Sequence, residues 1–574
     1  MDNAKNIIDL HDVQGNIMVN FAGYGCHKSR YFFLHISNAA HGRMFIKNIT
    51  GLVSTAAFMA EKDEDGLIIP PLVTTNIAFT YNGLKELGIP TLTLQDFPDE
   101  FVVGIRNRAS ILGDDLTSAP EKWDAVYRKD IHLFISIDGA NEALIEERYQ
   151  QIKDIIDDSL KECKEEHLVP ADQASGIKIL DGCRDDESDN KAYQDASVVY
   201  EEVDGQKIPT AKEHFGYTDG ISNPFFKGMT PEMGEVLGGG KRVGYGSPKS
   251  PASWEPIETG EFILGYKDEA NEYPAAPIPK LFSKNGSYLV FNKFHENVGK
   301  YHAYLDAASQ KYDIEKELLA AKYVGRWRNG APLTTYPKKA DAEDAWKVWS
   351  AAQWQVGKLF AAIMELKGKI ATEQDPAKKD LLIQEKKKLL AEYFGAAANF
   401  KVINQTFTAF NYDDDIPGSK CPVGAHMRRA NPRGALEFGN KNAFANPSAL
   451  DNRRRIIRRG LPYGVPTLDS NDKEHGTIIM TIVSNIKRQF EFVIQQWLNY
   501  GNDFKLANDK DPITGNMGEE GGQMVIEGNP ALPDDPAKFL LEIPRFVETR
   551  GGVYLFLPSI TSLNMIGKGI VDPT

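Results

Sequence analysis

The stretch DIHLFISIDGANEALIEERYQQIKDIIDDSLKE, residues 130–162, contains the two kinds of element from which we expect the fold to be built. Residues 130–137 alternate in the manner of a β-strand. Residues 141–162 carry apolar side chains at helical spacing, namely Ile145, Tyr149, Ile152, Ile155, Ile156 and Leu160. The stretch therefore predicts a strand that is followed by an amphipathic helix.

The same order of elements recurs on both sides of this stretch. In the first half we expect a helix near 40–53 and strands at 31–37, 75–81 and 176–181. In the second half we expect an amphipathic helix between the last two of three strands, at 286–294, 476–484 and 552–558. The double pattern predicts an α+β fold with two sheets, each covered on one face by helices.

A change of composition marks an insertion at about residues 338–400. This segment is rich in Ala, Lys, Glu, Gln and Leu, and Asp375-Pro376 separates two strongly helical runs. We expect an inserted helical hairpin. Its Trp346, Trp349 and Trp354 could form a redox relay, but aromatic residues at helical spacing usually pack, and we favour packing.

The overall composition excludes several classes of protein. The chain has 574 residues, 42% hydrophobic and 25% charged, which is typical of a globular protein of more than one core. Its net charge of −14 argues against a protein built to bind nucleic acid. The four cysteines form no C-x-x-C or C-x-x-C-H motif, and we find no secretion signal or membrane-spanning run. We expect a cytoplasmic protein.

The segment CPVGAHMRRANPRG, residues 421–434, places one histidine, His426, among several arginines. A neutral imidazole can bind haem iron, and guanidinium groups such as those of Arg428, Arg429 and Arg433 can pair with haem propionates. Taken alone, a histidine in such a segment is more often a structural residue than a ligand, so this segment leaves both roles open.

Two further segments contain candidate catalytic groups. FGYTDGISNP, residues 215–224, is either an ordinary turn or a tight turn that displays Asp219 as an acid/base group, where Gly220 allows a flat cofactor to come close. DNRRRIIRRGLPYG, residues 451–464, has five arginines in seven positions. Such a run is either a solvated face or an anion site, and an arginine there could stabilise the charge that develops as a peroxide bond breaks.

Together these segments resemble the dye-decolorizing peroxidase family. The other matching motifs are HDVQGNI at 11–17, VGRWRNGAPL at 324–333, RRGLPYG at 458–464, RQFEFVIQQW at 488–497 and RGGVYLFLPS at 550–559. The motifs occur in order over nearly the whole chain, which makes the resemblance far more specific than any one of them.

The resemblance implies two ferredoxin-like domains of the dimeric α/β-barrel kind, at residues 1–245 and 246–574, the second with the helical insertion. It implies non-covalent haem b, with His426 as the iron ligand and Asp219 and Arg458 as catalytic residues on the opposite face. We expect Arg433, Arg326, Gly220 and Phe291 to contact the cofactor.

The family activity implied is the reduction of hydrogen peroxide with oxidation of bulky aromatic or dye-like donors. A haem-handling protein that does not turn over peroxide is the alternative, and the oligomeric state is open. A ligating histidine usually donates its second N–H to an acceptor. For His426 we place Asn485 in that role, with Glu491 as the rival.

Overall fold

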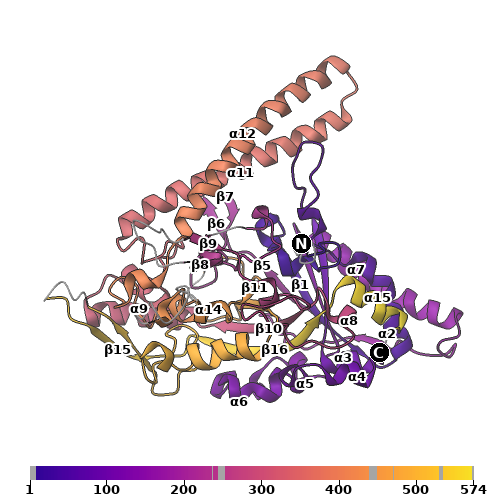
Figure 1. Ribbon diagram of the computed structural model, residues 1–574, viewed down its shortest axis with the longest axis horizontal. Helices are drawn as coiled ribbons and strands as arrows, with labels where there is room; N and C mark the ends of the chain where they lie inside the picture. Colours follow the sequence, from indigo (N-terminus) through magenta and orange to yellow (C-terminus); the bar gives the residue numbers. More distant parts are fainter. Residues whose placement is uncertain are drawn as a thin grey trace.

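The computed structural model describes residues 8–203, 205–234, 237–243, 253–437, 449–468, 471–528 and 534–571. Ten strands form its principal sheet, in the order β11-β13-β10-β16-β2-β3-β1-β4, with β12 beside β13 and β5 beside β1 (Figure 1). In that order the path strands are Ile457–Arg459, Gly476–Val483, Ser287–Glu296, Val547–Leu557, Val73–Phe79, Leu133–Gly139, Lys28–Ile36 and Ile177–Ile179. The two flanking strands are β12 (Pro462–Tyr463) and β5 (Gln194–Ser197).

The sheet consists of two antiparallel halves that meet at one edge. The strands of the amino-terminal half pair with one another, as do those of the carboxy-terminal half. Between the halves, β16 pairs with β2 only at Phe556 and Phe79. The predicted α+β class is confirmed, although the two expected sheets share this edge and form one continuous sheet.

Helices cover the amino-terminal half of the sheet. Helix α7 (Glu142–Glu165) begins at Asn141, whose side chain accepts a hydrogen bond from the Leu144 N–H, and it buries the face that carries Ile145 and Ile152. Helix α2 (Ala39–Ile49) packs beside it, and α15 (Ile560–Lys568) packs against α2. The predicted strand and amphipathic helix of residues 130–162 are therefore both present.

The interior between the two halves is aromatic. Phe291 of β10 packs against Phe33 and Tyr31 of β1, with ring centroids 5.4 and 5.7 Å apart, and against Phe134 of β3 at 5.2 Å. All four side chains are buried. Burial of such large rings stabilises the contact between the halves far more than the single strand pairing does.

The insertion forms a long helical hairpin that projects from the body (Figure 1). Its helices are α11 (Lys339–Thr372) and α12 (Pro376–Thr408), and Asp375 caps the second by accepting from the Ala377 N–H. Trp346 stacks on Trp349 at 4.9 Å, so packing is confirmed for this pair. Trp354 is 63% exposed, so packing was the wrong expectation for this residue.

No helix among the described residues has both the length and the apolar character needed to cross a bilayer.

Candidate active site

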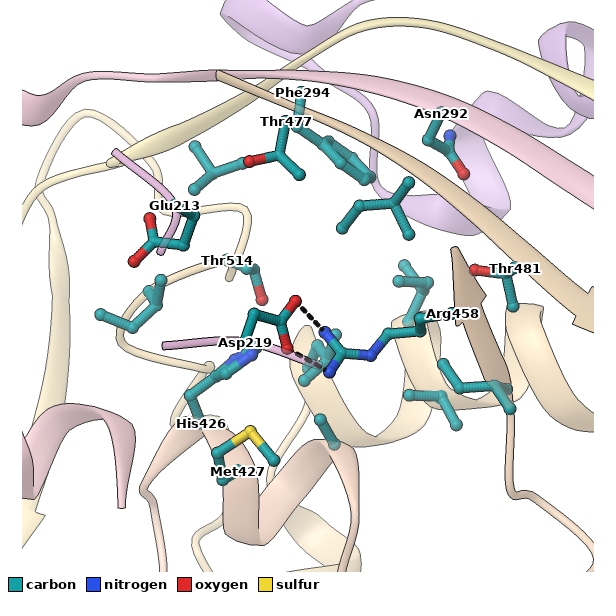
Figure 2. Close-up of a pocket in the computed structure, with 18 of the residues that line it drawn as sticks. Glu213, Asp219, Asn292, Phe294, His426, Met427, Arg458, Thr477, Thr481 and Thr514 are labelled. Carbon is teal, nitrogen blue, oxygen red and sulfur yellow. Dashed lines mark hydrogen bonds and ion pairs between the residues drawn. The ribbon is translucent and has the colours of Figure 1, made fainter. Parts of the chain in front are cut away.

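A cavity of about 280 Å³ lies on the carboxy-terminal half of the sheet. Its walls come from segments far apart in the sequence: residues 213–224, strands β10, β11 and β13, the helix that begins at His426, and residues 490–499 (Figure 2). Its size is at the lower end of the range of ligand pockets. Its lining combines polar and charged groups with a large set of apolar side chains, including Val324, Met427, Ile456, Ile479, Phe490, Val493, Ile494, Leu498 and Ile513.

Asp219 and Arg458 both line this cavity, and their side chains form a bidentate ion pair (Figure 2). The Nη2 and Nη1 groups of Arg458 donate to Oδ1 and Oδ2 of Asp219 at 2.6 and 3.1 Å. Arg458 comes from β11, which pairs with β13 in the sheet, so its backbone is fixed. The sequence prediction that these two residues share a site is matched by their positions.

The turn that carries Asp219 is also held in place. The Asp219 N–H donates to the Ala211 carbonyl, and Gly220, at φ 75°, donates its N–H to Oδ1 of Asp219. A residue with a β-carbon would adopt this φ only with strain. Gly220 therefore positions Asp219 and is not itself among the residues that line the cavity.

Asp219 is held in its ionised form. Burial alone would raise the pKa of its carboxyl, but Arg458 and the Gly220 N–H outweigh it and lower that pKa below its ordinary value. The accessible part of the carboxylate faces the cavity. It is therefore a base that can accept a proton across the pH range in which proteins usually work.

His426 lies at the first position of the short helix α13 (His426–Ala430) and also lines the cavity. Its Nδ1 is 3.1 and 3.0 Å from the two carboxylate oxygens of Asp511, which is buried. The backbone N–H groups of Ile513 and Thr514 donate to Asp511 as well. With Nδ1 engaged as a donor, Nε2 is the nitrogen left to act as a ligand.

The expected partner of His426 was wrong, since neither Asn485 nor Glu491 contacts it. Asn485 Oδ1 accepts from the Arg488 N–H at the start of its own helical segment. Glu491 pairs with Arg108 and accepts from the Tyr554 hydroxyl. Asp511 lies 85 positions beyond His426, in a loop.

A sequence signal for the Asp511 loop exists. The run Asp511-Pro-Ile-Thr514 is typical of a turn in which an aspartate accepts from backbone N–H groups two and three positions on. The run gives no indication that the turn would face a histidine.

Three buried arginines lie together beside the cavity: Arg326, Arg433 and Arg455. Arg326 and Arg455 line it, and Arg433 bonds to the hydroxyl of Ser222, which lines it too. None of the three forms an ion pair with a carboxylate among the described residues, although Asp451 lies near enough to Arg455 to affect its pKa. Burial, together with the neighbouring Arg326 and Arg455, lowers the pKa of Arg433 well below its ordinary value.

Such a cluster fits an anionic ligand, because a bound anion would supply the negative charge that buried guanidinium groups need. Of the arginines beside His426 in the sequence, Arg428 and Arg429 are instead used structurally, donating to the carbonyls of Cys421 and Trp497. Arg455 lies in the arginine-rich segment 451–464, but the sequence did not identify it as a cavity residue.

Phe291 does not line the cavity. Successive residues of a strand face opposite sides, and the aromatic interior takes Phe291, whereas Asn292, Phe294 and Glu296 face the cavity. The contact with a cofactor that we expected for Phe291 is therefore wrong, and its neighbours on the strand face the cavity instead. Glu213 and Glu296 also line the cavity and were not foreseen.

Comparisons with known proteins agree with this fold. The family domain described as "DyP dimeric alpha+beta barrel domain" matches residues 12–167. A dye-decolorizing peroxidase of Mycena epipterygia is 26% identical over 602 aligned residues, which cover 99% of this chain and 88% of that protein. A multifunctional dye peroxidase of an Amycolatopsis species is 24% identical, with 98% and 94% covered.

The solved structure of an ancestral D-type dye decolorizing peroxidase superposes with a TM-score of 0.63 at 25% identity, covering 97% of this chain and 99% of that one. The similarity thus includes both halves of the sheet.

Proposed function

The chain belongs to the dye-decolorizing peroxidase family, and we propose that its cavity holds haem b non-covalently, reduces hydrogen peroxide to water and draws electrons from aromatic or dye-like donors. The observation that carries this proposal is the pairing of an ionised Asp219 with Arg458 in the same cavity as a histidine whose Nδ1 is fixed by a carboxylate. Each of these residues has one defined task.

His426 is proposed to bind the iron through Nε2. Asp511 accepts the Nδ1 proton, so the tautomer is fixed and the imidazole is made a stronger electron donor. Arg326, Arg433 and Arg455 would pair with the propionates, and the apolar side chains would contact the flat ring. When bound, haem supplies the redox chemistry that no side chain offers.

Asp219 is proposed to move the peroxide proton. It would accept a proton from one oxygen of hydrogen peroxide and return it to the other oxygen, which leaves as water. Arg458 keeps the carboxylate ionised and stabilises the negative charge that develops as the bond between the oxygens breaks. The two residues are thus a base and a fixed charge, held in one geometry by their shared hydrogen bonds.

We place the protein in a reducing compartment, the cytoplasm, because its four cysteines are unpaired thiols, all of them buried.

The test is the absorption spectrum of the haem-loaded protein before and after one equivalent of hydrogen peroxide, followed by an aromatic donor. A peroxidase shows a shift of the Soret band that the donor reverses. A haem-handling protein needs His426 and the three arginines but not an acid opposite Arg458. A spectrum that peroxide leaves unchanged would therefore favour that alternative.

A further inference from the structure

Two glutamates of the cavity lie against each other. Glu213 accepts from the N–H groups of Phe215 and Tyr217 at 2.7 and 2.8 Å, and the hydroxyl of Thr477 donates to Glu296 at 2.6 Å. The backbone N–H of His214, the residue after Glu213, donates to Oε2 of Glu296 at 3.2 Å, which brings the two carboxyl groups close together. Glu296 is buried, and the accessible part of Glu213 faces the cavity, where Figure 2 shows it near Asp219.

Neither glutamate has a cationic partner among the residues that the structure describes. The remaining titratable groups around them do not supply positive charge, since Asp219 adds negative charge and Arg458 is paired with it. Burial lowers the pKa of His214 to about 4, so this imidazole is neutral, and its ring stacks on that of His475.

The nearby tyrosines supply no positive charge either, and the hydroxyls of Tyr217 and Tyr301 are hydrogen-bonded to each other. The guanidinium of Arg328 contacts Tyr217 but pairs with Glu317, while Tyr463 lies beyond His214 and donates to Glu474.

Ionising both of two adjacent carboxyl groups without a counter-charge is costly, so the charge on the first raises the pKa of the second. Burial, and then the Glu296 carboxyl, raise the pKa of Glu213 well above its ordinary value, and burial raises the pKa of Glu296 as well. The pair therefore titrates as a unit and keeps one shared proton above the ordinary glutamate range.

Peroxide reduction needs such a proton. Its balance is H2O2 + 2 e⁻ + 2 H⁺ → 2 H2O, so two protons must enter the cavity with the two electrons. Asp219 carries the peroxide's own proton from one oxygen to the other, but its lowered pKa means that it stores none. A donor oxidised outside the cavity releases its proton there and not at the reacting oxygen.

We propose that Glu213 and Glu296 hold one shared proton in the cavity and give it up during the reductive half of the reaction. The inference deepens the proposed peroxidase function and rests on it. On releasing the proton the pair becomes two carboxylates. It is recharged by a proton from the oxidised donor or from solvent, so that no other reactant is required.

The shared proton can be tested without turnover, by infrared difference spectroscopy of the full chain with and without haem at pH about 6, where ordinary carboxyls are ionised. The double variant Glu213→Gln/Glu296→Gln should remove the carboxylic-acid band of the pair, whereas each single variant should shift that band, because burial keeps the remaining carboxyl protonated. Asp138→Asn is the control, because burial raises the pKa of this carboxyl to about 6 in the amino-terminal half, remote from the cavity.

The second readout separates the two halves of the reaction. In the double Gln variant the Soret shift caused by peroxide should keep its rate, because Asp219 and Arg458 are intact. The donor-driven return should slow on the order of 10²-fold, as expected for loss of an acid catalyst. In the wild type that return should slow as the pH rises through the raised pKa of the pair, and this limb should be absent from the double variant.

Two results would overturn the inference alone: a double variant that loses no acid band, or a band that disappears while the return keeps its wild-type rate and pH profile. A wild type without any Soret shift would overturn the peroxidase function and the proton-donor role with it. Unchanged thermal unfolding of the Gln variants establishes that the fold is intact, and Asp138→Asn should lose its own band with no change in the return.

Discussion

Both carboxylate oxygens of Asp511 lie within hydrogen-bond distance of Nδ1 of His426, at 3.0 and 3.1 Å. Burial raises the pKa of Asp511, but the histidine and the surrounding N–H groups outweigh it and lower that pKa below its ordinary value. The carboxylate is therefore charged, and the imidazole that it contacts carries partial anionic character.

Replacing Asp511 should change the ferric/ferrous potential of the bound haem. In Asp511→Asn the partner of Nδ1 is neutral, so we expect a higher ferric/ferrous potential and haem affinity or peroxide rate lower by about 10- to 100-fold. Spectroelectrochemical titration measures the potential. Asn485→Asp is the control: it adds an acid where no contact with His426 exists, and should leave the potential unchanged. A shift in the control but not in Asp511→Asn would contradict the assignment.

Removing the ligand itself should have a larger effect. His426→Ala is expected to lose haem or bind it weakly, because Nε2 of this residue is the proposed iron ligand. Haem retention is read from the ratio of Soret to protein absorbance after gel filtration. His302→Ala, in helix α9 (Val298–Tyr312), is the matched control and should retain haem. Retention of haem with an unaltered spectrum in His426→Ala would refute the role of this residue.

Arg458→Leu should slow the peroxide step on the order of 10²-fold, as for loss of one charge-stabilising donor. It should also change the pH profile. Asp219 works as a base, so the wild-type rate is lost only as pH falls below the ordinary aspartate range, where Arg458 has placed its pKa. Without the arginine this fall should begin at higher pH. The measurement is the second-order rate of the Soret shift across pH.

Asp219→Asn removes the base while leaving Arg458 in place. The peroxide step should be slow at every pH and should lack the acid limb altogether, since no carboxylate remains to be protonated. The same stopped-flow experiment tests it. If the variant reacts as fast as the wild type with the same profile, Asp219 does not carry the proton.

A stability prediction concerns the strand that joins the halves. A β-carbon on Gly551 would lie 1.9 Å from the ring of Tyr127, so Gly551→Ala should lower the free energy of unfolding by about 1 to 3 kcal/mol. Gly357, in the exposed middle of α11, has no neighbour within 4 Å. Gly357→Ala should raise stability by roughly 0.5 to 1 kcal/mol, and denaturant unfolding compares the two variants. Equal stability of both would contradict the close contact.

Much of the fold was predictable because its elements have strong periodicity. The strand expected at 476–484 is Gly476–Val483, and the helix expected at 141–162 is Glu142–Glu165. The face of β10 was not predictable in the same way. Nearly every residue of that strand is buried, so hydrophobicity does not distinguish Phe291, in the aromatic interior, from Asn292, in the cavity.

The candidate site was predictable only where a motif stood for it. His426, Asp219 and Arg458 lie in motifs, and the structure brings all three to one cavity. Asp511 and the Glu213–Glu296 pair depend on contacts between segments far apart in the chain. A loop without periodicity gives no indication of which residue it will face, and that is why Asn485 was chosen in place of Asp511.

The position of β16 has a consequence for synthesis. It is the last strand of the sheet in the sequence, at Val547–Leu557, yet it lies between β10 and β2 in space. Until residues 547–557 have been translated, no strand pairing joins the two halves of the sheet, and Val547 and Thr549 are missing from the cavity wall. We therefore expect the cavity to be completed only after nearly the whole chain has been translated, although His426 and Asp511 are already present earlier.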